Sequence, residues 1–338
     1  MKIAIVGFPG SGKSTCFKAI TRKKKEEFET LDPTKAHLGA VKVSDPRLEK
    51  LKSIFHPKKL THAEIIFEDL PGFHLPGIKE IEAIMGVLGL FSGRNPVKDI
   101  VDLDAEFMLS DLEIISRRLP GLGKELKQEE SAEKKLEYET LVKCKKCLEE
   151  DTPLRVLDLT IEEEKSIRGF QFLSRKPIFL LGNIDENQAS GDIVKKMKDF
   201  CKEKGLKCVE FCAKLEAEIA DLEESERGAF LKELGMEEMA GEKMLKLAYS
   251  ALGYITFFTV KGDETKAWPV REGIRAIAAA GKIHSDIEKG FIKAEIVNFD
   301  DLVSCGSREE ARKKGLLKLE SKEYRIKDGD IVDFRFGK

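Results

Sequence analysis

The sequence predicts an α/β fold: a mostly parallel sheet covered by helices on both faces, an inserted helical hairpin, and a small α+β domain at the C-terminus. Three observations predict it. Continuous apolar runs alternate with helical segments in the first 250 residues, which is typical of parallel strands buried on both faces. A helical apolar stripe interrupts this alternation at 108–126, and short strand-like runs dominate after residue 253.

Length and composition set the frame for these elements. A chain of 338 residues predicts two or three structural units. We expect a nucleotide-binding domain formed by 1–101 and 166–250, a hairpin insertion at 102–165, and a separate domain at 253–338. Lys+Arg number 59 and Asp+Glu 61, so the net charge of -2 gives no global attraction to nucleic acid. Any basic contact must therefore be local.

Neither an export signal nor a membrane span is visible. The apolar run at the N-terminus is short and leads directly into a glycine loop, and no stretch approaches the roughly 18 apolar residues that cross a bilayer. We therefore predict a cytoplasmic protein without a membrane partner. Seven cysteines are scattered along the chain, and the single pair Cys144–Cys147 would need two further ligands to bind zinc, so a metal or redox role there is the less favoured interpretation.

The first strand, at residues 3–6, ends in a phosphate-binding loop. Residues 7–14 read GFPGSGKS and match the pattern G-x-x-x-x-G-K-[ST] between a strand and a helix. Such a loop turns backbone N–H groups toward phosphate oxygens at a helix N-terminus, while Lys13 reaches the β- and γ-phosphates and Ser14 coordinates Mg²⁺. The predicted nucleotide-binding residues here are Gly7, Pro9, Gly10, Ser11, Gly12, Lys13, Ser14 and Thr15.

The second strand, at 65–67, leads to a second motif. Asp69 stands where an acid that anchors Mg²⁺ is expected, at the end of a buried strand. Asp69-Leu70-Pro71-Gly72 also matches the D-x-x-G switch of GTPase-like proteins. An ordinary turn before Pro-Gly is the alternative, since the motif alone is weak. Its position downstream of the phosphate loop favours the switch.

Three further strands are predicted at 84–91, 177–181 and 207–211. The fourth strand ends at Asn183-Ile184-Asp185-Glu186, at the carboxyl edge of the sheet where ligands bind. GTPases usually carry N/T-K-x-D here, and the acid pairs with guanine. Glu186 is longer and shifts the carboxylate, which disfavours guanine and suits the amino group of adenine. A solvated loop without a binding role is the alternative.

The inserted hairpin is predicted from two helical segments. Met108, Leu112, Ile115, Leu119, Leu122 and Leu126 form one seam, which Pro120-Gly121 is expected to interrupt, and 129–150 forms the return helix. The hairpin either packs only on itself or serves as a lever or docking arm; the pattern fits both. After residue 253, strands are predicted at 254–260, 291–297, 324–326 and 331–336, in a domain of nearly balanced charge.

With these motifs placed, the chain resembles the YchF / Obg-like ATPase family of P-loop proteins almost from end to end. The resemblance rests on the motifs above and on residues 30–33, 45–49, 106–113, 176–177, 213–218, 255–259, 267–268, 279–295 and 328–331. It implies a GTPase-like core, an inserted hairpin, a β-grasp TGS domain, preference for ATP over GTP, and association with the ribosome or another translation component. RNA contact would then involve the hairpin and the TGS domain.

The resemblance also implies roles for single residues. Lys13, Asp69 and Gly72 become the catalytic set, and Ser14, Thr30 and Asp69 the Mg²⁺ set. Asn183 and Glu186 become the base-binding residues, supported by the backbone at Ala213 and Lys214. His284 near Asp286 has a structural or partner-contact use as its better interpretation, because nothing nearby supplies a nucleophile.

Two departures from the family pattern bear on activity. Gly10 replaces the usual Asn of the phosphate loop, and the glycine-rich switch after D-x-x-G is largely deleted. Phe73 keeps the family's hydrophobic residue, while His74 is either catalytic or, more simply, an exposed turn residue. The leading hypothesis is a slow ATPase switch. A non-hydrolysing nucleotide-gated binding module and a true GTPase are the alternatives.

Overall fold

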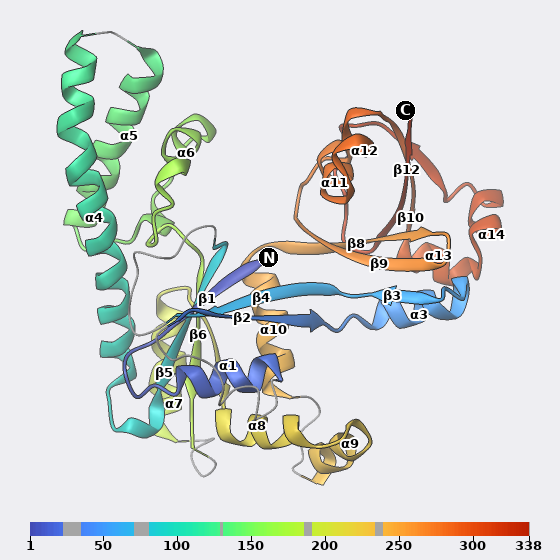
Figure 1. Cartoon of the computed structure of the whole chain (residues 1–338), viewed down its shortest axis with the longest axis horizontal. Helices are drawn as coiled ribbons and strands as arrows, with labels where there is room; N and C mark the ends of the chain where they lie inside the picture. The colour runs from blue at the N-terminus through green and yellow to red at the C-terminus, as the bar shows by residue number, and fades with distance from the viewer. Residues whose placement is uncertain (23–34, 71–80, 129–130, 186–190, 234–238, 338) are drawn as a thin grey trace. The chain divides into compact units, whose positions relative to one another are not determined.

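The structure, a computed structural model, describes the whole chain except residues 23–34, 71–80, 129–130, 186–190, 234–238 and 338 (Figure 1). The chain packs as two compact units. The larger unit contains Lys2–Gly39 and Ile66–Met244, and the C-terminal unit contains Met1, Ala40–Ile65 and Leu245–Lys338. Residues 40–65 thus pack with the C-terminal unit, whereas the sequence predicted them as part of the nucleotide-binding domain.

A six-stranded sheet in the order β2-β4-β1-β5-β6-β7 organises the larger unit. Its strands are β1 (Lys2–Val6), β2 (His37–Val43), β4 (Ala63–Asp69), β5 (Ala83–Gly89), β6 (Ile178–Asn183) and β7 (Lys207–Phe211). The pairs β1–β4, β1–β5, β5–β6 and β6–β7 are all parallel, which confirms the predicted sheet. Register pairs such as Ile5 with Asp69 and Gly89 with Asn183 bring the carboxyl ends of these strands to one edge.

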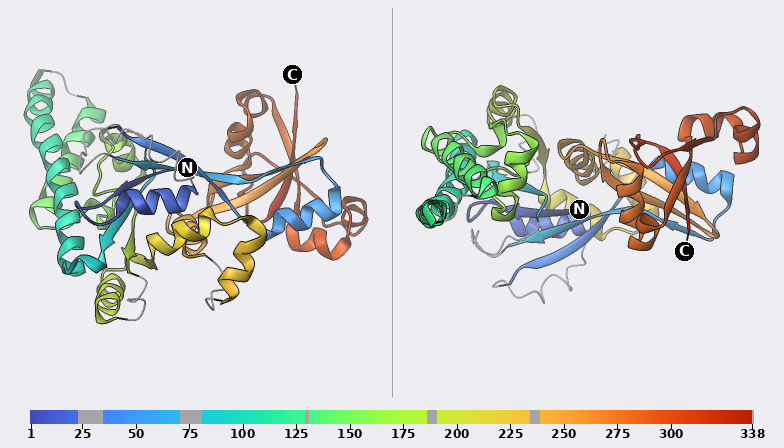
Figure 2. Two further views of the ribbon diagram at one scale, coloured as in Figure 1. Left: turned by 60° about the horizontal axis from the view of Figure 1, so that its bottom comes forward. Right: turned by 90° about the horizontal axis from the view of Figure 1, so that it is seen from above.

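Helices cover this sheet because their apolar faces are buried against it. Ile100 and Leu103 of α4 and Met197 of α7 belong to one buried cluster with Ile84 and Leu180 of the strands. The remaining helices of the unit include α1 and α8, which pack against each other (Figure 2). The bounds are α1 (Lys13–Thr21), α7 (Asp192–Glu203), α8 (Ala213–Asp221) and α9 (Glu224–Glu233), with the short η2 (Leu90–Ser92) before α4. Helix α10 (Ala240–Ala251) begins in this unit, which ends at Met244, and its remaining residues belong to the C-terminal unit.

The helical hairpin consists of α4 (Pro96–Gln128) and α5 (Ala132–Glu149), followed by η3 (Leu154–Val156), α6 (Ile161–Ile167) and η4 (Arg168–Phe170) (Figure 1). The expected interruption at Pro120-Gly121 is wrong: α4 runs through Pro120 as one helix. A proline inside a helix costs about 3 kcal/mol. The seam that continues on both sides of it, with Ile115 and Leu122 fully buried against Leu141, offsets this cost.

Asp111 fixes the base of the hairpin. Its carboxylate accepts hydrogen bonds from the backbone N–H groups of Leu173 (2.8 Å) and Ser174 (2.7 Å) and from the Ser174 hydroxyl (2.7 Å). The side chain is completely buried, and this burial raises the pKa of Asp111 to about 6, although the three hydrogen bonds act in the opposite direction. Cys144 and Cys147, the possible zinc pair, lie inside the hairpin core, where burial raises the pKa of both thiols.

The C-terminal unit is built on a second six-stranded sheet in the order β11-β10-β12-β8-β9-β3. Its strands are β3 (Lys59–Thr61), β8 (Tyr254–Lys261), β9 (Glu264–Arg271), β10 (Phe291–Asn298), β11 (Lys318–Glu320) and β12 (Asp330–Phe336). The strand predicted at 324–326 is wrong: Arg325 forms only an isolated bridge with Arg275. Strand β3 comes from the N-terminal part of the chain and pairs in parallel with β9.

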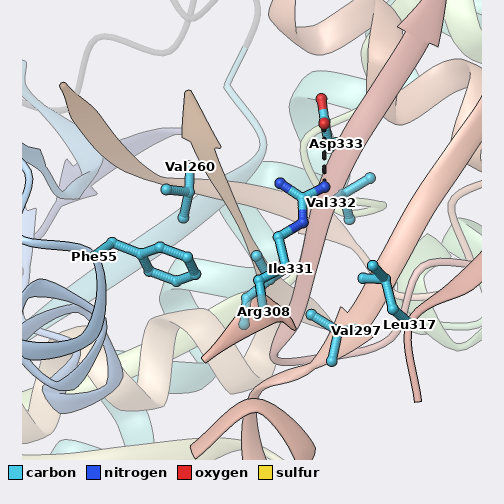
Figure 3. A pocket seen from close by; sticks show the side chains of 8 residues that line it. All are labelled: Phe55, Val260, Val297, Arg308, Leu317, Ile331, Val332 and Asp333. Atoms are coloured by element: carbon cyan, nitrogen blue, oxygen red, sulfur yellow. Dashed lines mark hydrogen bonds and ion pairs between the residues drawn. The ribbon is translucent and has the colours of Figure 1, made fainter. Parts of the chain in front are cut away.

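Two buried clusters flank the second sheet. Helix α11 contributes Ala276 and Ala279 to a cluster with Phe257 and Phe334. Helices α3 and α13 contribute Leu48 and Leu302 to another cluster. The helices of this unit are α3 (Pro46–Phe55), α11 (Ala276–Ile283), α12 (Ser285–Lys289), α13 (Phe299–Cys305) and α14 (Arg308–Lys313). Phe55 of α3 also lines a small pocket with residues of strands β8 and β12, where Arg308 pairs with Asp333 at 3.1 Å (Figure 3).

Among the described residues, none of the helices combines the length and the apolar composition that a membrane span requires.

Candidate nucleotide-binding site

The phosphate loop lies between β1 and α1, as predicted. Gly10 and Gly12 have φ values of 82° and 80°, in the left-handed region that glycine adopts without strain. Gly12 caps the N-terminus of α1, and the turn is closed by hydrogen bonds from Ser11 N to Phe8 O (3.1 Å) and from Cys16 N to Gly12 O (2.9 Å). This geometry leaves the first N–H groups of α1 outside the helix ladder, where phosphate oxygens can accept from them.

The phosphate loop packs closely against the carboxyl end of β5. A Cβ atom on Gly7 would lie 2.7 Å from both the Ser11 hydroxyl and the Val87 carbonyl, and one on Gly89 would lie 2.9 Å from the Ser11 Cα. These two glycines let the loop settle directly on the end of β5. Gly89 was not among the predicted site residues; the signal available in the sequence was a glycine at the carboxyl end of an apolar strand.

Lys13 and Asp69 meet at the carboxyl edge of the sheet. The Lys13 Nζ lies 3.3 Å from Asp69 Oδ1 and also donates a hydrogen bond to the Leu70 carbonyl. Asp69 is 4% exposed, and its Oδ1 accepts no hydrogen bond within the described part of the chain. The pairing brings together the cation predicted to bind phosphate and the acid predicted to anchor Mg²⁺. Beneath them, burial and the Asp69 charge raise the pKa of the Cys16 thiol, so Cys16 stays neutral.

Asn183 joins the phosphate loop to the start of α8. Its Nδ2 donates to the Ser11 carbonyl (3.0 Å), and its Oδ1 accepts from the Ala213 backbone N–H (3.1 Å). The residue is 4% exposed, and Nδ2 would lie only 2.2 Å from a Cβ on Gly12. In this structure both ends of the amide are used by the protein itself. Asn183 therefore holds two loops in register, a function that its residue type alone did not reveal.

Glu216 of α8 ties this helix to the start of α10. This buried carboxylate accepts hydrogen bonds from the N–H groups of Ala240 (2.6 Å) and Gly241 (3.2 Å), at the start of α10. Burial raises the pKa of Glu216, opposed by these hydrogen bonds. Ala213, whose N–H donates to Asn183, is buried, and Lys214, the next residue of α8, is exposed.

Arg94, which was not among the predicted site residues, stacks on Phe8 of the phosphate loop. The Arg94 guanidinium lies 5.1 Å from the centre of the Phe8 ring and is held by Asp99, 2.9 Å away. Pro9 lies on the phosphate loop, and Ser14 and Thr15 lie on the first turn of α1; all three residues are exposed. Thr30, Gly72 and Glu186, predicted for the metal, the γ-phosphate and the base, lie outside the described residues, as do Phe73 and His74.

The donor set present fits a hard divalent cation. Mg²⁺ takes oxygen ligands and is usually bound in NTPases by one or two protein oxygens together with substrate phosphates. Ser14 is an exposed residue on the first turn of α1 and offers a hydroxyl, and Asp69 offers a buried carboxylate oxygen that faces the Lys13 ammonium at 3.3 Å. In the same part of the chain, no group of three or more His, Cys, Asp or Glu side chains is arranged to hold a metal.

Taken together, the parallel sheet, the glycine loop capping α1, and the Lys13–Asp69 pair at the carboxyl edge define a P-loop nucleotide-binding protein with a GTPase-like core. Comparisons with known families agree. A family model described as "50S ribosome-binding GTPase" matches residues 2–184, and the YchF-GTPase_C model, described as a protein of unknown function, matches residues 254–337.

Relatives match the chain over its full length. "Ribosome-binding ATPase YchF" of Bacillus subtilis is 35% identical and that of Escherichia coli O157:H7 is 34% identical, with 98% and 99% of both chains covered. The solved structure of the Schizosaccharomyces pombe YchF GTPase has a TM-score of 0.84 at 26% identity, covering 99% of this chain and 97% of that one. The chain belongs to the YchF family, as the resemblance predicted.

Proposed function

We propose that the chain binds ATP with Mg²⁺, hydrolyses it slowly, and acts as a nucleotide-dependent switch at the ribosome in the cytoplasm. The observation that supports this most directly is the phosphate loop held against β5 and Asn183, with Lys13 beside Asp69. The choice of ATP as nucleotide and of the ribosome as partner is supported by the relatives named ribosome-binding ATPases, which match nearly the whole chain.

Different groups of the site are proposed to bind the phosphates and the Mg²⁺ ion. Backbone N–H groups of residues 10–14 receive the phosphates, Lys13 neutralises the β- and γ-phosphates, and the N-terminus of α1 adds its partial positive charge. Ser14 and Asp69 would hold Mg²⁺, with Thr30 joining them. When bound, the cation neutralises charge that develops on the phosphates during transfer. We assign the γ-phosphate contact to Gly72.

Base selection is proposed for Glu186, with Asn183, Ala213 and Lys214 supporting its loop. The exocyclic amino group of adenine can donate to the Glu186 carboxylate, which matches the ATPase name of the relatives. GTP is the second candidate, because the S. pombe structure is titled a GTPase.

Turnover depends on the segment after Asp69. Alignments with the relatives run over 362 positions, more than the 338 residues of this chain, so the relatives carry residues that this chain lacks. The deletion predicted after D-x-x-G is consistent with this. A non-hydrolysing, nucleotide-gated binding module is therefore the second mechanism to test. For the partner, we propose ribosomal RNA contacts through the hairpin and the C-terminal domain.

Calorimetry with ATP and GTP in the presence of Mg²⁺ tests the binding, and a phosphate-release assay on the same sample tests the turnover. Lys13→Ala should weaken ATP binding about ten- to a hundredfold, since a hydrogen bond to a charged group contributes about 1.5–3 kcal/mol. Lys18→Ala is the matched control, because Lys18 lies on the same helix and only approaches Asp221 at 3.9 Å. ATP binding without turnover would favour the binding module, and tighter GTP binding would overturn the assignment of Glu186.

Co-sedimentation with ribosomes, with and without ATP, tests the partner. We expect more protein in the ribosomal pellet in one nucleotide state than in the other. Equal, salt-sensitive pelleting in all states, and with Lys13→Ala, would contradict a nucleotide-dependent switch.

A further inference from the structure

Two cysteines face each other where α7 turns back into β7. Cys201 lies near the end of α7 and is 1% exposed, whereas Cys208 is the second residue of β7 and is half-buried. Their thiols are hydrogen-bonded to each other. Cys201 belongs to the buried cluster that contains Met197 and Leu180, and Cys208 packs against that cluster. The pair therefore lies wholly within the larger unit, at the edge strand of its sheet.

The turn between the two cysteines is a Schellman motif, which fixes their placement. The N–H of Leu206 donates to the Cys201 carbonyl at 2.8 Å. The N–H of Gly205 donates to the Lys202 carbonyl at 3.3 Å. Gly205 has a φ of 64°, in the left-handed region that this motif needs and that glycine adopts without strain. The chain therefore reverses direction directly after Cys201 and returns Cys208 to it.

An ion pair forms the next contact between α7 and β7. Lys198, one helical turn before Cys201, lies 2.7 Å from Glu210, two residues beyond Cys208. Residues three apart on a helix, or two apart on a strand, share a face, so this pair lies beside the two thiols.

The neighbours of the two thiols shift their pKa values in opposite directions. The hydrogen bond from Cys201 lowers the pKa of Cys208, and the positive charge of Lys198 acts in the same direction. Burial and the Glu210 carboxylate oppose this shift. The hydrogen bond with Cys208, together with burial, raises the pKa of Cys201, which therefore stays protonated.

The two thiols differ in the way that a peroxide-sensitive pair requires. Cysteines that react with peroxide combine thiolate character with access to solvent, and they lie beside a second, resolving thiol that closes a disulfide. Cys208 has the access and the lowered pKa, and Cys201 is the neighbouring thiol. A structural cysteine is instead buried and inert, as Cys144 is in the hairpin core of the same unit.

We propose that Cys201 and Cys208 form a redox modification site, in which a hydroperoxide oxidises Cys208 and Cys201 then closes a disulfide bond. With hydrogen peroxide, the Cys208 thiolate attacks one oxygen and the O–O bond breaks, which leaves a sulfenic acid on Cys208 and releases hydroxide. This hydroxide takes up the proton that the Cys208 thiol had lost and becomes water. The Cys201 sulfur then attacks the Cys208 sulfur, the S–O bond breaks, and the departing hydroxide takes the Cys201 proton. Two thiols thereby give up two electrons, and one peroxide becomes two waters.

Mass spectrometry of the full-length protein tests the site. The reduced protein is treated with hydrogen peroxide at neutral pH, denatured, alkylated with N-ethylmaleimide and digested with trypsin without reductant. The expected product is a disulfide between the tryptic peptides 199–202 and 208–214, which dithiothreitol separates. Because the second peptide also contains Cys212, fragment spectra must assign the linked sulfur to Cys208.

Cys305 is the matched control within the same sample. It is also half-buried, but it lies in the C-terminal unit, where its sulfur is 3.9 Å from the Ser304 hydroxyl. Cys208 should lose its thiol at least about threefold faster than Cys305, because a larger thiolate fraction outweighs the lower nucleophilicity of a thiolate with a lowered pKa. This comparison needs no variant and therefore does not depend on how a variant folds.

Two serine variants separate the roles of the thiols. Cys208→Ser should abolish the disulfide and leave Cys201 reduced, because Cys201 is 1% exposed. Cys201→Ser should still be oxidised at Cys208 but should stop at the sulfenic acid, which dimedone traps as a stable adduct. In the native protein, the disulfide should replace most of this adduct.

Three outcomes would overturn the inference: a disulfide from Cys208 to Cys212, oxidation of Cys305 before the disulfide forms, or sulfenic or sulfinic acid on Cys208 of the native protein without a disulfide to Cys201. A linked peptide 199–202 and 208–214 in Cys208→Ser would also overturn it, since the link would then involve Cys212. The experiment contains no nucleotide. Its result is therefore independent of whether the chain binds or hydrolyses ATP.

Discussion

Replacing Asn183 by alanine removes the amide that holds the phosphate loop against the start of α8. Two hydrogen bonds are lost, from Nδ2 to the Ser11 carbonyl (3.0 Å) and from the Ala213 N–H to Oδ1 (3.1 Å). Each contributes about 1 kcal/mol net, and the Ala213 N–H, on a residue 2% exposed, is left buried without an acceptor. We therefore expect the free energy of unfolding to fall by about 2–4 kcal/mol.

Urea unfolding followed by circular dichroism measures this loss, and calorimetry measures the effect on the site. Because the Ser11 carbonyl is no longer held, the loop's N–H groups lose their alignment, and we expect ATP affinity to fall at least about tenfold. Asn183→Asp separates the two bonds: the carboxylate still accepts from Ala213 but places an oxygen against the Ser11 carbonyl. It should bind ATP as poorly as the alanine variant or worse. A loss below about 0.5 kcal/mol with unchanged binding would refute the reasoning.

Three further predictions follow from buried groups. Gly12→Ala should abolish ATP binding in calorimetry and lower the melting temperature, because its Cβ would lie 2.2 Å from Asn183 Nδ2 at a φ of 80°; normal binding would contradict this steric argument. Ser11→Ala removes a buried hydroxyl that has no hydrogen-bond partner among the described residues, so the free energy of unfolding measured in urea should rise by about 1 kcal/mol, with ATP affinity unchanged. A loss of affinity of about tenfold would show that the hydroxyl binds nucleotide. Asp111 has a pKa raised to about 6 from 3.8, so its protonated form favours folding below about pH 4 and this contribution is lost as pH rises through 6. Stability measured from about pH 4 to 7 should therefore decline by up to about 3 kcal/mol in the native chain and stay flat in Asp111→Asn, and equal slopes would contradict the assignment.

The elements of the larger unit could be predicted from sequence where periodicity and burial agree. Residues 207–211 form β7 with the predicted bounds, and β5 and β6 differ from the predicted bounds by one or two residues. Strand β9 was not predicted. Its sequence ETKAWPVR mixes charged and apolar residues and contains a proline, and a proline argues against a strand when only the sequence pattern is considered. Its pairing with β8 supplies the hydrogen bonds that the pattern did not indicate.

In the candidate site, too, residues identified by a local motif could be predicted, and residues whose contacts are distant in the chain could not. Lys13, Ser14 and Asp69 follow from motif and position, because a glycine loop and a strand end dictate their chemistry locally. The bridging function of Asn183 and the packing of Gly89 could not be predicted, since both depend on atoms far away in the chain: Asn183 and Ser11 are separated by 172 residues.

The late arrival of β9 has a consequence for how the chain is made. Thr61 and its partner Glu264 are 203 residues apart, so at about 5–20 residues per second the ribosome takes roughly 10–40 s to supply the second after the first. During this interval Leu48 and Leu51 of α3 have no C-terminal cluster to enter. A nascent chain stalled before residue 254 would therefore expose the apolar face of α3, and it would become a target for chaperones until synthesis resumes.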